Sequence, residues 1–90
     1  MVQGALAVGN AARSVQKEAA GRRAGSEVAL RRRLQRAKRE SDLPKNSDPA
    51  ELARYVMTVL RGMAVQGADG ARPDQLHRVA QVALRAWPKQ

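Results

Sequence analysis

Residues 48–66 read DPAELARYVMTVLRGMAVQ, and this stretch decides the fold more than any other part of the chain. It opens with residue types that begin a helix. An aspartate such as Asp48 accepts hydrogen bonds from the first backbone N–H groups of a helix, and proline is favoured at the position of Pro49. Glu51 follows where a capping box places an acidic side chain. The stretch therefore predicts a helix over residues 49–66.

Two apolar rows run along this predicted helix, on different sides. The first row contains Leu52, Val56, Leu60 and Met63, and the second contains Tyr55, Thr58, Val59, Gly62, Met63 and Gln66. A helix that is apolar on two sides must be buried on two sides. Because so short a chain covers only one side by itself, we expect a partner on the other. Gly62 costs a helix interior about 1 kcal/mol relative to Ala, which the close approach of another backbone would explain.

The rest of the sequence predicts further helices. We expect a short helix over residues 3–9 with a break near Gly9-Asn10, a long helix over 11–41, a linker over 42–47, and a last helix from Pro73 to the stop at Pro88. This pattern predicts an all-α fold: a helical bundle of one short, one long and two antiparallel helices, the last two forming a four-helix dimer interface. Residues 1–90 form one domain, with a basic part over 1–47 and a hairpin over 48–90.

The composition argues against catalysis. The chain has no cysteine, which excludes disulfides and thiolate metal sites. Its single histidine, His77, has no partners at the spacing that a metal site or acid–base catalysis needs. We therefore predict no enzyme activity, no metal and no cofactor. No apolar run is long enough to cross a membrane and no secretion signal is present, which favours a cytoplasmic location.

Positive charge is concentrated in the first half. The formal net charge is +9, and residues 1–47 hold eleven Lys or Arg against four Asp or Glu. Charges four residues apart predict ion pairs along the long helix: Arg23–Glu27, Glu27–Arg31, Glu18–Arg22 and Arg36–Glu40. Arg32, Arg36 and Arg39 share a side, which supports an alternative function, a small basic helical protein that binds nucleic acid or an acidic partner directly. We favour a solvated face, because no aromatic side chain is interleaved to stack on bases.

The segments, taken in order, resemble a known family. They are residues 3–9, the long arginine-rich helix, 41–44, 48–55, 60–66, 70–71 and 76–87. In this order they resemble the C-terminal domain of TetR-type transcriptional regulators. The resemblance implies a homodimer built from the last two helices and a ligand cavity enclosed partly by the long helix and the one after it. It also implies that operator DNA is read by an N-terminal helix-turn-helix, which these residues do not include. Arg72 departs from the expected Ser, Thr or Asp helix cap.

The sequence and the resemblance together predict two sets of functional residues in a transcriptional repressor. The predicted dimer interface contains Tyr55, Thr58, Val59, Gly62, Met63, Gln66, Val79, Val82, Ala83 and Ala86. The predicted ligand cavity contains Val15, Ala19, Leu52, Val56 and Leu60. The expected partners are a second copy of the chain, a small apolar or amphipathic effector and, only through the N-terminal domain, operator DNA.

Overall fold

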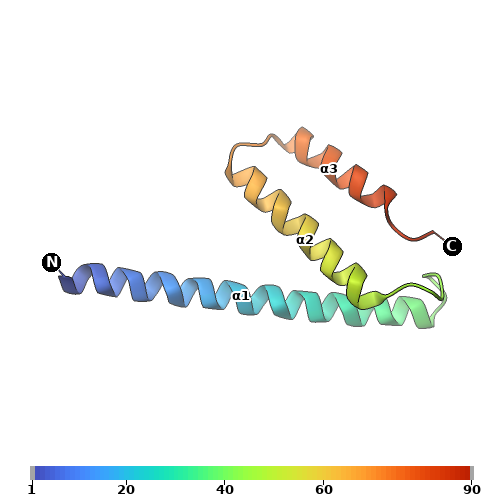
Figure 1. Ribbon diagram of the computed structural model, residues 1–90, viewed down its shortest axis with the longest axis horizontal. Coiled ribbons are helices and arrows are strands. Elements are labelled where there is room, and N and C mark those ends of the chain that lie inside the picture. Colours follow the sequence, from blue (N-terminus) through green and yellow to red (C-terminus); the bar gives the residue numbers. More distant parts are fainter. Residues whose placement is uncertain (1, 90) are drawn as a thin grey trace.

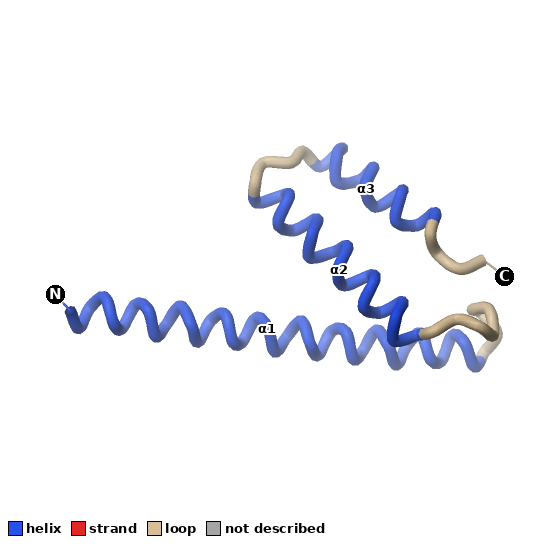
Figure 2. Tube along the Cα trace, viewed as in Figure 1, coloured by secondary structure: helices blue, strands red, loops and turns tan. Residues whose placement is uncertain are grey.

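The computed structural model describes residues 2–89, and the side chains from residue 9 onward. The described part of the chain contains three helices and no strand: α1 (Val2–Arg39), α2 (Pro49–Ala68) and α3 (Pro73–Arg85). They form a flat layer of 61 × 30 × 13 Å, with α2 leaning back over α1 and α3 running along the far side of α2 (Figures 1 and 2). The all-α prediction is therefore confirmed, whereas the dimer interface involves a second copy and stays a prediction.

The predicted count of four helices is wrong, because no break occurs at Gly9-Asn10. Helix α1 continues through both residues and is one element of 38 residues. The Asn10 side chain accepts a hydrogen bond from the Arg13 guanidinium at 2.9 Å, one turn further along the helix. Its side chain therefore does not compete with the helical backbone, and a single glycine costs a helix only about 1 kcal/mol.

Helix α1 ends in a left-handed residue and a pair of backbone hydrogen bonds. Ser41 has φ 65°, and the N–H groups of Ser41 and Asp42 donate to the carbonyls of Lys38 and Ala37 at 3.2 and 2.8 Å. This is the Schellman arrangement, which satisfies carbonyls that the last turn leaves free. It reverses the chain direction, so that the linker returns toward α1.

A small core lies where this linker joins α1 to α2. Its buried apolar residues are Leu34 on α1, Leu43 in the linker and Ala53 on α2. Leu30, Ala37, Leu52 and Trp87 pack around them. Ser47 is also buried, and its backbone N–H donates to the Pro44 carbonyl at 3.0 Å. The core thus fixes the start of α2 against the last third of α1 and leaves the first half of α1 extending beyond it.

The predicted start of α2 is confirmed. The Asp48 carboxylate accepts hydrogen bonds from the backbone N–H groups of Ala50 and Glu51 at 3.0 and 3.3 Å, and Pro49 is the first helical residue. These two donors have no partner inside a helix, so the aspartate side chain replaces the missing carbonyls. The cap sets the point at which α2 leaves the core.

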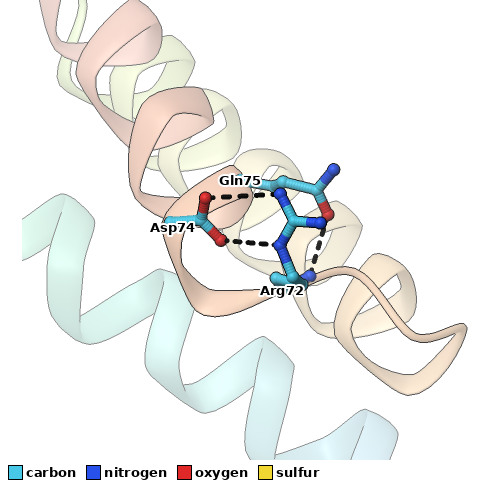
Figure 3. A network of polar contacts seen from close by, with 3 residues as sticks. All are labelled: Arg72, Asp74 and Gln75. Carbon is cyan, nitrogen blue, oxygen red and sulfur yellow. Dashed lines mark hydrogen bonds and ion pairs between the residues drawn. The ribbon is translucent and has the colours of Figure 1, made fainter.

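The connection from α2 to α3 is also set by local chemistry. Gly70 has φ +100°, and Ala71 and Gly70 donate to the carbonyls of Gln66 and Gly67 at 2.9 and 3.1 Å, a second Schellman arrangement. Pro73 begins α3, as predicted. Although the Arg72 side chain has no acceptor to offer, the Gln75 side chain accepts from the Arg72 backbone N–H at 2.9 Å, and the Arg72 guanidinium contacts Asp74 at 3.1 Å (Figure 3).

Two glycine substitutions should change stability in opposite directions. We expect Gly70→Ala to lower the free energy of unfolding by about 1 kcal/mol, because an L side chain disfavours the left-handed conformation. Gly25→Ala should raise it by about 1 kcal/mol, because alanine is the better helix former and a Cβ at Gly25 meets no atom within 4 Å. Urea unfolding followed by circular dichroism at one protein concentration measures both; equal shifts in the same direction would contradict the assignment of Gly70 to the cap.

Candidate functional site

A hydrogen bond between helices fixes the hairpin of α2 and α3. The Tyr55 hydroxyl donates to the Ala83 carbonyl at 2.9 Å, and both residues are half-buried. Ala83 lies in the last turn of α3, and its carbonyl also accepts a hydrogen bond from the Ala86 backbone N–H at 3.2 Å. The Tyr55 hydroxyl is therefore a second donor to this carbonyl, and the bond sets the register of the two antiparallel helices. Tyr55, which was predicted as an interface residue, also has this role within the chain.

One side of the hairpin carries an open apolar groove of about 360 Å³. It is lined by Tyr55, Val56, Val59, Leu60, Met63, Ala80, Ala83, Leu84 and Trp87. Two of these residues have a side-chain hydrogen-bonding group, Tyr55 and Trp87, and the Tyr55 hydroxyl already donates to Ala83. This groove therefore offers an apolar surface with no free polar group apart from the Trp87 ring nitrogen.

A second apolar surface lies on another side of the same hairpin. It consists of two adjoining grooves, one lined by Thr58, Val59, Gly62, Met63, Gln66, Leu76 and Val79, the other by Tyr55, Val59, Arg78, Val79, Val82 and Ala83. Leu60 lines the first side and Gly62 the second, and residues two apart on a helix point about 200° apart around its axis. On α3, Val82 and Leu84 are separated in the same way and are 59% and 68% exposed. Large apolar side chains this exposed, and gathered on both sides of one element, are typical of surfaces that a partner covers.

The second surface gathers most of the predicted dimer residues. Nine of the ten predicted residues line one of the two adjoining grooves, and Ala86 caps the end of α3 as an exposed residue. A Cβ placed on Gly62 meets no atom within 4 Å, so no other described segment of the chain approaches it closely. The expected close approach of another backbone at Gly62 can come only from outside the described residues.

The predicted ligand-cavity residues lie in separate places. Val15 is 65% exposed on the first half of α1, whereas Leu52 packs against the core. Val56 and Leu60 line the apolar groove of the hairpin, and Ala19 is half-buried on α1. Spacing along a helix identified the apolar positions, but it could not show that α2 diverges from α1 and turns Val56 and Leu60 toward α3.

Between α1 and α2, the described part of the chain forms a notch that is lined partly by charged residues. Its volume is about 330 Å³, and it is lined by Ala20, Arg23, Ala24, Glu27, Arg54, Met57, Thr58 and Arg61. Arg54 Nε lies 3.2 Å from Glu27 Oε1, which joins the two helices. The predicted pairs of Glu27 with Arg23 and Arg31 along α1 are wrong, because the Glu27 carboxylate faces α2 and pairs with Arg54. The signal was available: Glu27, Leu30 and Leu34 are spaced three and four apart and therefore share the face that packs.

Two other predicted pairs along α1 are confirmed, Glu18 with Arg22 at 3.3 Å and Arg36 with Glu40 at 2.8 Å. The alternative function, nucleic-acid binding, rests on three arginines that are all exposed: Arg32, Arg36 and Arg39. Arg36 is engaged by Glu40, so Arg32 and Arg39 remain as the cations of this set without an ion pair. No group of three or more acidic or histidine side chains in the described chain is placed to hold a metal ion.

Comparison with known proteins relates the chain to a transcriptional regulator. It is similar to the HTH-type transcriptional repressor ComR of Escherichia coli, with 28% identity over 68 residues, which are 76% of this chain and 32% of the repressor. The chain thus spans about a third of the length of that relative. No protein-family model matches the chain, and no solved structure does. None of the helices between residues 2 and 89 combines the length and apolar character that crossing a membrane requires.

The hydrogen bond between α2 and α3 can be tested directly. We expect Tyr55→Phe to lower the free energy of unfolding by about 1 kcal/mol, the usual net value of one such bond. The ring stays in place, so packing is preserved and only the hydroxyl is lost. Fluorescence of the single tryptophan, Trp87, reports unfolding near this site. A variant as stable as the parent would show that the hydroxyl does not hold the hairpin together in solution.

Proposed function

We propose that this chain is the ligand-sensing and dimerisation portion of a TetR-type transcriptional repressor. The observation that carries the proposal is the hairpin of α2 and α3, whose apolar surface lies on two sides of a single helical layer. Similarity to part of a helix-turn-helix repressor supports the regulatory class, and the order of segments supports the family. The role is non-catalytic and cytoplasmic, and operator DNA is bound by a helix-turn-helix that these residues do not include.

The proposed dimer uses the second surface of the hairpin, around Gly62 and Val82. A two-fold axis placed there would bring α2 and α3 of each copy together as four helices. Gly62 lets the facing backbone approach, since a glycine leaves no side chain between them. The apolar groove on the other side, around Leu60 and Leu84, is then left for other parts of the intact regulator.

In this proposal, signalling follows from the geometry of α1. A ligand bound between α1 and α2 changes the angle between them, because the core holds the two helices together only near Leu34 and Ala53. The dimer holds α2 fixed, so α1 moves. Such a movement selects one of two arrangements of the DNA-binding segments and thereby changes operator affinity.

The dimer surface is tested by two charge substitutions on α3. Val82→Glu should give a monomer, because it places a carboxylate in the proposed interface, where burying an unpaired charge costs several kcal/mol. Leu84→Glu is the matched control: it is a similarly exposed residue of the same helix on the other side, and it should leave the dimer intact. Sedimentation velocity at several concentrations measures both. A dimer that survives Val82→Glu but not Leu84→Glu would place the interface on the opposite groove.

Gly62 gives a second test of the same interface. Gly62→Ala should weaken dimerisation about tenfold or more, as expected for an added methyl group in a close helix contact, although it favours helix formation within one chain. Gly25→Ala is the control, because it makes the same chemical change on α1. If Gly62→Ala strengthens or preserves the dimer, no second backbone approaches Gly62.

The second candidate function, direct binding of nucleic acid, is favoured by the exposed cations Arg32 and Arg39 on α1. It predicts tight, steeply salt-dependent binding to DNA. Under the regulator proposal this chain should bind a DNA duplex no more tightly than the non-specific range of about 10⁻⁴–10⁻⁶ M at physiological salt. Fluorescence anisotropy of a labelled duplex measures this, and a much lower Kd that Arg32→Gln raises would favour the second candidate.

A further inference from the structure

The notch between α1 and α2 has more positive charge than its own partners neutralise. Three guanidinium groups line it, those of Arg23, Arg54 and Arg61, against one carboxylate, that of Glu27. Glu27 engages Arg54 at 3.2 Å, whereas Arg23 and Arg61 make no hydrogen bond or ion pair with the described residues. Arg23 on α1 and Arg61 on α2 thus carry two guanidinium groups without a partner beside one neutralised pair.

The chemistry of these groups selects an anion with several oxygens. A guanidinium presents a planar fork of N–H donors that matches a carboxylate or a phosphate, and two such forks can hold one head group. The Glu27 carboxylate is 32% exposed and the Arg54 side chain 77% exposed, so solvent and a bound anion can both reach the pair. An incoming anion therefore meets Arg23 and Arg61 directly and competes with Glu27 for Arg54.

The rest of the notch is apolar and has no free hydroxyl donor. Ala20 and Ala24 on α1 and Met57 on α2 also line it. The Thr58 hydroxyl donates to the Arg54 carbonyl at 2.7 Å, so its proton is already used. The two alanines leave room for a compact hydrocarbon body beside the charged rim. A ligand that fits both parts carries an anionic head and an apolar body.

We propose that this notch binds a small amphipathic organic anion, whose carboxylate or phosphate is held by Arg23 and Arg61 and whose apolar body lies on Ala20, Ala24 and Met57. The inference deepens the ligand-sensing part of the proposed function and rests on it. Because the Glu27–Arg54 pair joins α1 to α2, an anion that draws Arg54 away from Glu27 weakens the link between the two helices. Ligand binding and helix movement are thereby connected through one ion pair.

Isothermal titration of the full chain with octanoate, octyl phosphate and neutral octanol tests the proposal. Octanoate or octyl phosphate should bind, and octanol should bind at least tenfold more weakly. We expect Arg23→Gln and Arg61→Gln each to weaken anion binding about fivefold, the upper end of the range for losing one solvent-exposed ion pair. Glu27→Gln should strengthen it about threefold, because it removes a competing charge. The relative affinities of octanoate and octyl phosphate identify the preferred head group.

Arg32→Gln is the matched control, since it removes the same charge from the same helix outside the notch. It should leave anion binding unchanged, and an equal loss in Arg32→Gln and Arg61→Gln would show non-specific attraction to a basic protein and overturn the proposal. If octanol binds as well as octanoate and the arginine variants bind both normally, the anion assignment fails while ligand sensing stands. If no compound binds although sedimentation shows a dimer, the ligand-sensing part of the proposed function fails together with this inference.

Discussion

The structure depends on the contact of Leu34, Leu43 and Ala53, where the end of α1, the linker and the start of α2 meet. Hydrophobic burial at this point is what holds two long helices at one relative position. The contact is small, because two leucines and an alanine contribute little apolar area compared with the core of a typical domain. Helix α3 is tied on through the Tyr55 hydroxyl and through Trp87, which packs against the same core. Three apolar side chains are buried in this core, whereas six large apolar side chains of the described chain are exposed, and that imbalance is the physical reason for expecting association.

Local chemistry made the starts of α2 and α3 predictable. Asp48, Pro49 and Pro73 act within a few residues of themselves, so their effect can be read without knowing the tertiary structure. The break expected at Gly9-Asn10 was wrong because turn-forming residue types only permit a turn, and nothing there forces one, such as a proline. The place of Leu43 in the core could not be predicted either. The linker returns to α1 only because Ser41 adopts a left-handed conformation, which a non-glycine residue does not signal in the sequence.

The candidate sites were predictable to different degrees. The residues of the second hairpin surface can be identified from the helical spacing within α2 and within α3. The hairpin then places these two helix faces next to each other. Predicting the residues of a ligand cavity requires the angle between α1 and α2. The spacing of apolar residues along one helix does not determine that angle. The wrong assignment of Glu27 has the same origin: the spacing of charges along one helix predicts pairs within that helix, whereas the pair with Arg54 depends on how the two helices cross. A surface formed by one helix can thus be predicted from the local sequence. A site between two helices depends also on the core contacts that set the angle between them.

The length of α1 has a mechanical consequence. At a rise of 1.5 Å per residue, the axis from Leu34 to Val2 is about 48 Å long, while that from Leu34 to Glu27 is about 10 Å. If α1 rotates about Leu34, the Glu27–Arg54 pair lies close to the pivot and the first turn of α1 lies far from it. A displacement at the pair then becomes about five times larger at the first turn of α1. A shift of about 1 Å, the size of one altered side-chain contact, becomes about 5 Å at the tip. In the proposed mechanism α1 therefore acts as a lever, and its stiffness, to which the continuous turns through Gly9 and Asn10 contribute, determines how much of the displacement reaches its first turn.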